Sequence, residues 1–204
     1  MKIGILTQPL HANYGGLLQN YALQQTLIRA GHEVETVDWE GAGKGLRCLL
    51  YDIKVKTLHF LFPSKYPKLR YKPNEKEKAI IQRNTNHFIN TYIKHTETIH
   101  SYDGFVKQAE GGGYRAFVVG SDQCWRPCYN TFLKSMFLDF VQDKQVKRIA
   151  YAASFGTDKW EFTPQQNRGC KALAQKFNLV TVREDSGVKL CKEHLGVDAV
   201  HVLD

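Results

Sequence analysis

The 204-residue sequence lacks any long apolar run, and no stretch reaches the ~18 uncharged residues that a membrane-spanning helix needs. An export signal is also missing at the N-terminus, where the apolar run Ile3 to Leu6 ends at once in Thr7-Gln8-Pro9. Cysteine is scarce, and its odd count of five argues against a framework of disulfides. We therefore expect a cytoplasmic protein with reduced thiols.

Signatures of cofactors and metals are missing too. The stretch GAGKG at 41–45 is similar to a phosphate-binding loop, but Gly45 follows the lysine where that loop needs Ser or Thr, and position 38 is not glycine. The same stretch lacks the last glycine of a dinucleotide fingerprint. Cys124 and Cys128 lie four apart, yet no second pair has zinc-like spacing. We expect neither a bound cofactor nor a metal.

Positive charge is concentrated in one segment. The net charge is +8, and residues 44–94 hold 12 Lys and Arg against 3 Asp and Glu, so the rest of the chain is nearly neutral. Tyr66 and Tyr71 interleave with lysines there, as in some nucleic-acid-binding surfaces. No recognised nucleic-acid motif accompanies them, and we expect no nucleic-acid partner.

Outside that segment, strand patterns alternate with helical patterns. The first unit is a strand over Lys2–Leu6, a helix over Gly16–Ala30 that stops at Gly31, and a strand over 33–38. Further strands are predicted at 116–119, 148–154, 179–182 and 199–203, and further helices at 163–177 and 186–195. Thr163 and Pro164 are typical of a helix start. The alternation predicts an α/β fold, a Rossmann-like, doubly wound and mostly parallel sheet.

Residues 41–110 interrupt this alternation. We interpret the chain as a single domain, 1–204, with a basic insertion at about 41–110. A helical apolar stripe spans 46–61, a Pro- and Lys-rich loop follows, and a helix is predicted at 75–92. Either the stripe packs on the sheet with its lysines in solvent, or 44–72 rests on the anionic inner face of a membrane.

Four polar loops follow the predicted strands, at 7–16, 120–125, 154–158 and 183–186, where parallel sheets bind ligands. In the first loop, Asn13, Tyr14, Gly15 and Gly16 can present N–H groups at a helix N-terminus to an anion or a sugar oxygen. The alternative is that the two glycines only permit a tight turn.

The second and fourth loops supply the charged groups. Ser121, Asp122 and Gln123 follow a short apolar strand, and Asp122 could orient a hydroxyl or act as a base, or merely cap a helix. Arg183 combines a bidentate guanidinium with a helix N-terminus and so suits a phosphate or carboxylate. Its alternative role is a salt bridge to Glu184 or Asp185.

Taken together, these loops resemble the polysaccharide pyruvyl transferase family, over nearly the whole chain. The matching stretches are HANYGGLLQNYALQQTLIRAGHEVETVDW, VVGSDQCW, FLDFV, KRIAYAASFG and VTVREDSGVKLCKEHLGV. The resemblance implies the N-terminal half of a GT-B-like enzyme that moves the enolpyruvyl group of phosphoenolpyruvate onto two sugar hydroxyls, in bacterial cell-surface polysaccharide synthesis. By the same resemblance Arg183 binds the donor, and Gln19 and Ser154 join the loop residues above as substrate-binding candidates.

The resemblance also implies which substrates bind and whether this chain holds all of the catalytic residues. The acceptor would be a sugar or a lipid-linked oligosaccharide, with phosphoenolpyruvate as co-substrate. An essential histidine and a further arginine would lie in a second domain beyond Asp204, so this chain alone is expected to be inactive. The alternatives are a GT-B-like nucleotide-sugar glycosyltransferase and a non-catalytic domain that binds a sugar or a partner.

Overall fold

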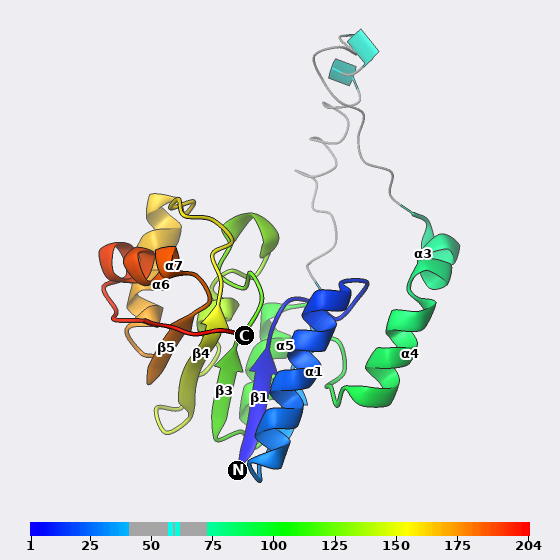
Figure 1. The fold of residues 1–204 in the computed structure, drawn as a ribbon, viewed down its shortest axis with the longest axis horizontal. Helices are drawn as coiled ribbons and strands as arrows, with labels where there is room; N and C mark the ends of the chain where they lie inside the picture. The colour runs from blue at the N-terminus through cyan, green and yellow to red at the C-terminus, as the bar shows by residue number, and fades with distance from the viewer. Residues whose placement is uncertain (41–56, 59, 62–72) are drawn as a thin grey trace. The chain divides into compact units, whose positions relative to one another are not determined.

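A computed structural model describes residues 1–40, 57–58, 60–61 and 73–204 (Figure 1). The chain forms two compact units, one made of residues 1–41 and 84–204 and the other of residues 42–83. In the second unit, α3 (Glu75–Ile81) begins at a capping box between Asn74 and Glu77. The predicted stripe 46–61 and the proposed membrane contact 44–72 lie almost wholly outside the described residues.

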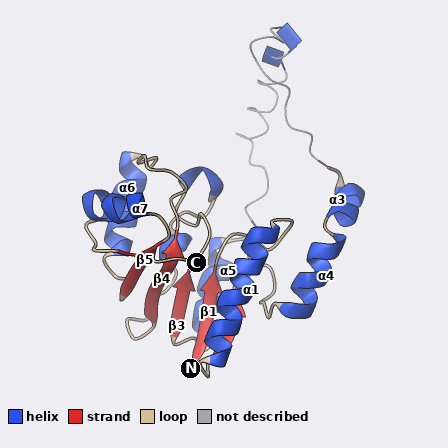
Figure 2. Cartoon of the chain, viewed as in Figure 1, coloured by secondary structure: helices blue, strands red, loops and turns tan. Residues whose placement is uncertain are grey.

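The larger unit is built on a six-stranded sheet in which every pairing is parallel (Figure 2). The strand order is β2-β1-β3-β4-β5-β6. The strands are β1 (Lys2–Leu6), β2 (Glu33–Thr36), β3 (Ala116–Val119), β4 (Lys147–Ala153), β5 (Leu179–Val182) and β6 (Val200–His201). This confirms the predicted Rossmann-like α/β fold. All six strands occur within the segments where the alternation predicts them, to within a residue.

The helices follow the sequence signals closely. They are α1 (Tyr14–Arg29), α4 (Arg83–Tyr92), α5 (Tyr102–Gly111), α6 (Pro164–Ala174) and α7 (Asp185–Leu190). At α6, Thr163 caps the backbone N–H of Gln166, and Pro164 is the first helical residue, as predicted. A π-helical turn, Cys191–Leu195, prolongs α7 as far as Gly196. The predicted helix 75–92 is instead two helices, α3 and α4, with a break at Gln82.

Part of the predicted insertion 41–110 belongs to the sheet unit. Residues 93–99 run beside β2, and parallel bridges pair Thr36 with His95 and Trp39 with Ile99. Helix α5 then packs on the sheet through Phe105, which is completely buried in the largest hydrophobic cluster. These residues therefore form the crossover from β2 to β3.

The crossover from β3 to β4 contains no α-helix. Two short 3-10 turns, η1 (Pro127–Tyr129) and η2 (Ser135–Phe137), replace it. Buried aromatic side chains supply the packing that a helix would give: the Trp125 ring stacks on Phe137 with centroids 4.8 Å apart, and its Nε1 donates to the Met136 carbonyl at 2.9 Å. The loop after β3 is thus held by a rigid core.

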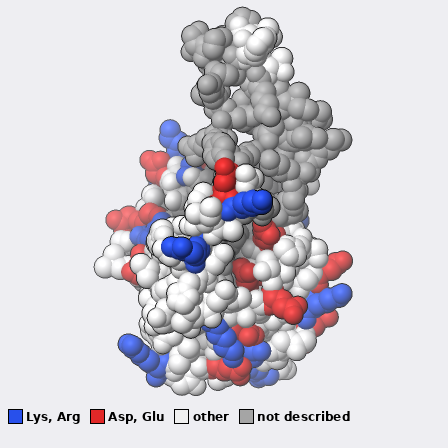
Figure 3. All heavy atoms as spheres, turned by 90° about the vertical axis from the view of Figure 1, so that its right-hand side faces the viewer, with Lys and Arg blue, Asp and Glu red and all other residues white. Residues whose placement is uncertain are grey.

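One face of the described residues carries side chains of both charge signs. In Figure 3, acidic and basic side chains are interspersed over the part of the face that is described. Among the helices that the structure describes, none combines the length and the apolar character needed to cross a membrane.

Candidate functional site

The loops after β1, β3, β4 and β5 meet at the carboxyl edge of the sheet. Gln8 Nε2 donates to the Gln123 carbonyl at 3.0 Å, which joins the first two loops. The Trp125 backbone N–H donates to the Ser154 carbonyl at 3.1 Å, and the Ser154 N–H donates to the Asp122 carbonyl at 3.2 Å. Direct hydrogen bonds thus link the loops, as expected for neighbouring parallel strands.

Asn13, Gly16 and Asp122 lie together where the strand order reverses, between β1 and β3. Asn13 Nδ2 lies 3.4 Å from Asp122 Oδ2. A Cβ on Gly16 would lie 3.0 Å from that carboxylate oxygen and 3.1 Å from Asn13 Nδ2, so a glycine lets the pair approach the first turn of α1. Asn13 is the N-cap residue of α1, but its side chain makes no capping hydrogen bond and turns to Asp122 instead.

The Asp122 carboxylate has a local role as well. Its Oδ1 accepts from the Gln123 backbone N–H at 2.7 Å, which closes the turn after β3. Because no α-helix follows this turn, Asp122 does not cap one, and that alternative is wrong. Gly120 precedes the turn with φ of +131°, and a Cβ there would lie 1.9 Å from the Tyr151 carbonyl oxygen. The close approach of the backbone therefore requires glycine.

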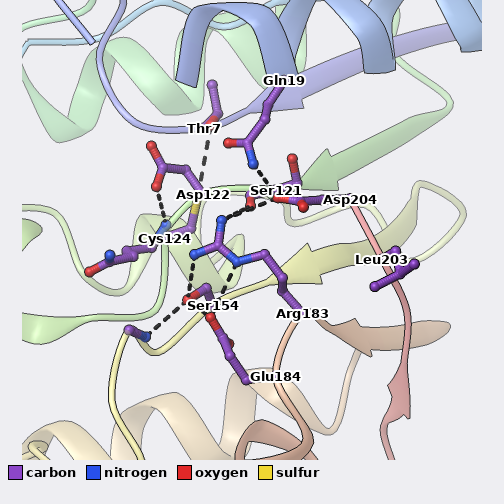
Figure 4. Close-up of polar contacts among 12 residues, drawn as sticks. Thr7, Gln19, Ser121, Asp122, Cys124, Ser154, Arg183, Glu184, Leu203 and Asp204 are labelled. Atoms are coloured by element: carbon purple, nitrogen blue, oxygen red, sulfur yellow. Dashed lines mark hydrogen bonds and ion pairs between the residues drawn. The ribbon is translucent and has the colours of Figure 1, made fainter. Parts of the chain in front are cut away.

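Arg183 lies at the centre of the second half of the site (Figure 4). Its Nη1 donates to Asp204 Oδ2 at 3.2 Å and to the Ser121 carbonyl at 3.4 Å. Its Nε contacts Glu184 Oε1 at 3.2 Å, and its Nη2 contacts Ser154 Oγ at 3.2 Å. The guanidinium thereby ties together the loops after β3, β4 and β5 and the residues after β6.

Arg183 keeps its positive charge although its side chain is only one-quarter exposed. Burial lowers the pKa of Arg183, but hydrogen bonds and charges from Asp204 and Glu184 outweigh burial and leave that pKa raised. The predicted alternative of a salt bridge is present with Glu184. Asp185 instead pairs with His201 at 2.8 Å. The Nε edge of the guanidinium thus faces Glu184, and Nη1 on the opposite edge faces Asp204.

Ser154 is completely buried, and its hydroxyl group is saturated. It donates to Glu184 Oε1 at 2.6 Å and accepts from Arg183 Nη2 and from the Gly156 N–H at 2.9 Å. A hydroxyl offers one donor and two acceptor positions, and all three are used within the protein. In this structure Ser154 therefore orients Arg183 and Glu184.

The remaining predicted residues divide into two groups. Gln19 reaches the site, because its side-chain amide donates to Asp204. The side chain of Gln123 also reaches the site, where it packs against Gly156. A Cβ on Gly156 would lie 2.2 Å from Gln123 Oε1. Tyr14 is 62% exposed at the start of α1, and neighbouring Gly15 is exposed too, so both lie at the rim of the site.

Sequence reasoning missed a buried asparagine that fastens the loop after β3. Asn130 Nδ2 lies 3.0 Å from the Cys124 carbonyl and 2.8 Å from the Arg126 carbonyl. Its Oδ1 accepts from Gln8 Nε2 at 3.0 Å. No local motif marks this residue, and only its depth, at 7% exposure, and its backbone and side-chain partners, which also include the Gln123 carbonyl at 3.4 Å, reveal the role.

A cavity of about 560 Å³ opens beside the site, between α1 and the strands β3 and β4. Its polar end consists of Gln19, Ser121 and Asp204. The rest of its lining is mostly apolar, from α1 and from the facing strands: Leu18, Ala22, Leu23, Leu27, Val118 and Ile149. The polar end therefore adjoins the Arg183 cluster, whereas the body of the cavity is hydrophobic.

Cys124 follows Asp122 and Gln123 in the site loop, and its side chain is buried. Burial raises the pKa of the Cys124 thiol to about 12, and the charge of Asp122 adds to this, so the thiol next to the site is not a thiolate at neutral pH. Within the same residues, no three His, Cys, Asp or Glu side chains are grouped so that they could hold a metal ion.

Comparison with known protein families gives a match over most of the chain. The family model described as polysaccharide pyruvyl transferase matches residues 13–204, which include all four strand-end loops except the first residues of loop 7–16. Neither the curated proteins nor the solved structures contain a significant match to the chain.

Proposed function

Because the chain belongs to the polysaccharide pyruvyl transferase family, we propose that its strand-end loops bind phosphoenolpyruvate and the hydroxyls of an acceptor sugar. The observation that carries this proposal is the position of Arg183, whose guanidinium already holds one carboxylate, that of Asp204, at 3.2 Å. A carboxylate or phosphate of the donor can take the same edge of the guanidinium, with Glu184 and Ser154 fixing the other edge.

The reaction needs two hydroxyls of one sugar, because both add to the same carbon of the donor. Protonation of the methylene carbon C3 of the enol phosphate makes C2 an oxocarbenium-like centre, which one sugar hydroxyl attacks as its proton leaves. The bond from C2 to the phosphate oxygen then breaks and phosphate departs, and the second hydroxyl adds to C2 with loss of its proton, which closes the ring of the pyruvate ketal. Arg183 would bind the anionic donor and neutralise the charge on the departing phosphate.

The Asn13, Gly16 and Asp122 group is placed to handle the acceptor. Asp122 Oδ2 has one amide partner, at 3.4 Å, and can accept a hydrogen bond from a sugar hydroxyl. A carboxylate in that position orients the hydroxyl and can take its proton. The N–H groups at the start of α1, beside Gly16, can donate to a sugar oxygen.

Donor binding by this chain tests the proposal directly, by calorimetric titration with phosphoenolpyruvate. Arg183→Lys keeps the charge but loses the bidentate fork, and the loss of a charge-assisted hydrogen bond costs about 1.5–3 kcal/mol. The Kd for phosphoenolpyruvate should therefore rise roughly 10- to 150-fold.

The control is Arg115→Lys, because Arg115 is exposed and directly precedes β3, at the end of the strands opposite the site. This substitution should leave the Kd for phosphoenolpyruvate unchanged. Equal donor affinity in Arg183→Lys and wild type would remove Arg183 from the site. Binding of nucleotide sugars in place of phosphoenolpyruvate would instead favour a glycosyltransferase.

A further inference from the structure

The pairing of β4 with β5 is irregular just before the site. It shifts by one residue between Ala150 and Ala153, so residues 151–152 of β4 lie opposite the single residue Thr181. Two residues opposite one form a β-bulge, which is rare in parallel sheets and is often found beside functional sites. Within the bulge Ala152 has φ of +45°, a conformation that residues with a Cβ seldom adopt. Specific contacts must therefore hold the bulge.

The Thr181 hydroxyl supplies those contacts. Its Oγ1 accepts from the Ala152 backbone N–H at 2.9 Å and donates to the Ala150 carbonyl at 3.0 Å. These two backbone groups lie on either side of Tyr151, and Thr181 is buried against them. Because buried backbone groups need hydrogen-bond partners, this one hydroxyl stabilises the shape of the bulge.

The bulge decides which face of the sheet the end of β4 presents. Side chains alternate between the two faces along a strand, and Ala150 belongs to the main hydrophobic cluster. Regular alternation would place Ser154 on the face of that cluster too. Because of the extra residue, Ala153 and Phe155 join the cluster instead, and Ser154 lies on the other side.

On that side Ser154 meets Arg183. Val182 of β5 belongs to the main hydrophobic cluster, so the next residue, Arg183, points the other way. Ser154 Oγ accepts from Arg183 Nη2 at 3.2 Å and donates to Glu184 Oε1 at 2.6 Å (Figure 4). The bulge thus brings the Ser154 hydroxyl to the edge of the guanidinium that it orients.

We propose that Thr181 is a positioning residue of the donor site, which acts through the bulge and Ser154 on Arg183. This role rests on the proposed function, in which Arg183 binds phosphoenolpyruvate. Without the Thr181 hydroxyl, the Ala152 N–H loses its buried partner and the end of β4 relaxes toward regular pairing. Ser154 then turns away from Arg183, and the guanidinium keeps its charge but loses its fixed orientation.

Donor binding, measured by calorimetric titration of the 204-residue chain with phosphoenolpyruvate, tests this role. Thr181→Val removes the hydroxyl at nearly equal volume and should raise the Kd roughly tenfold, the effect of one well-oriented hydrogen bond. Thr181→Ser keeps the hydroxyl and should bind the donor as wild type does. The matched control is Thr96→Val, because Thr96 is also buried and also joins a backbone N–H, of Asp38, to a carbonyl, of Glu97. It should destabilise the fold and leave the Kd unchanged.

Hydrogen exchange of single backbone amides, followed by nuclear magnetic resonance without any ligand, tests the steps inside the protein. The Ala152 N–H reports on its bond to Thr181, and the Gly156 N–H, which donates to Ser154 Oγ at 2.9 Å, reports on the position of Ser154. Both amides should exchange faster in Thr181→Val than in Thr96→Val, and Thr181→Ser should restore the slow exchange.

The two measurements separate this inference from the proposed function. If wild type does not bind phosphoenolpyruvate, the proposed function fails, and the exchange rates alone decide whether Thr181 positions Ser154. Gly156 exchange that is equal in Thr181→Val and Thr96→Val would overturn the inference. A donor Kd that is equal in Thr181→Val and wild type, or raised as far in Thr181→Ser, would overturn it too. If Thr181→Val fails to fold by far-ultraviolet circular dichroism, Thr181→Ala removes the same hydroxyl and takes its place.

Discussion

Replacement of Asn130 should loosen the loop that carries Ser121, Asp122 and Gln123. Asn130→Ala removes three short hydrogen bonds, which are the donations to the Cys124 and Arg126 carbonyls at 3.0 and 2.8 Å and the acceptance from Gln8 at 3.0 Å, together with a longer contact to the Gln123 carbonyl at 3.4 Å. At about 1 kcal/mol for each hydrogen bond, the free energy of unfolding should fall by about 3 kcal/mol. For a chain of this size the melting temperature should fall by roughly 6–12 °C.

A second substitution separates the hydrogen bonds from the volume of the side chain. Asn130→Asp keeps the shape but turns a carboxylate oxygen toward the Cys124 and Arg126 carbonyls, in a site only 7% exposed. It should destabilise the fold at neutral pH at least as much as Asn130→Ala, because one carboxylate oxygen would be buried against carbonyl oxygens with no donor in place of the lost N–H group. Urea unfolding followed by tryptophan fluorescence measures both variants.

The control for this series is Gln142→Ala, which removes an exposed amide with a single bond to the Asp139 carbonyl at 2.9 Å. It should change the free energy of unfolding by no more than about 0.5 kcal/mol. The reasoning fails if Asn130→Ala and Asn130→Asp both stay within that margin. It fails equally if the aspartate variant is clearly the more stable of the two.

Three further substitutions test single features of the fold. Gly120→Ala should cost several kcal/mol, because φ is +131° and the new Cβ would meet the Tyr151 carbonyl at 1.9 Å; thermal unfolding measures it. Burial raises the pKa of Asp139, so its charge destabilises the fold above the unfolded pKa; Asp139→Asn should raise the melting temperature at pH 7 and lose that advantage at acid pH. Thr163→Ala removes the cap on the Gln166 N–H and should cost about 0.5–2 kcal/mol in urea unfolding.

The sequence determined the order and the kinds of the elements. Alternation of apolar runs with helical patterns predicts every strand, because each pattern is written within a few neighbouring residues. Local capping chemistry at Thr163 and Gly31 places helix ends for the same reason. Since strands joined by helices pair in parallel, the polar loops after β1, β3, β4 and β5 also had to share one edge.

Only the tertiary structure decided which side chains in those loops meet. Arg183 contacts Ser121 and Ser154, which lie 62 and 29 residues away, and Asn130 accepts a bond from Gln8 across 122 residues. Such contacts leave no periodic signal, because they depend on how distant strands are ordered and spaced in the sheet. The same holds for Leu179, which belongs to a pattern that predicts a buried strand but is 50% exposed. Every crossover after β2 runs in one direction along the sheet, so among the described residues α1 is the helix that packs over the face on which Leu179 lies.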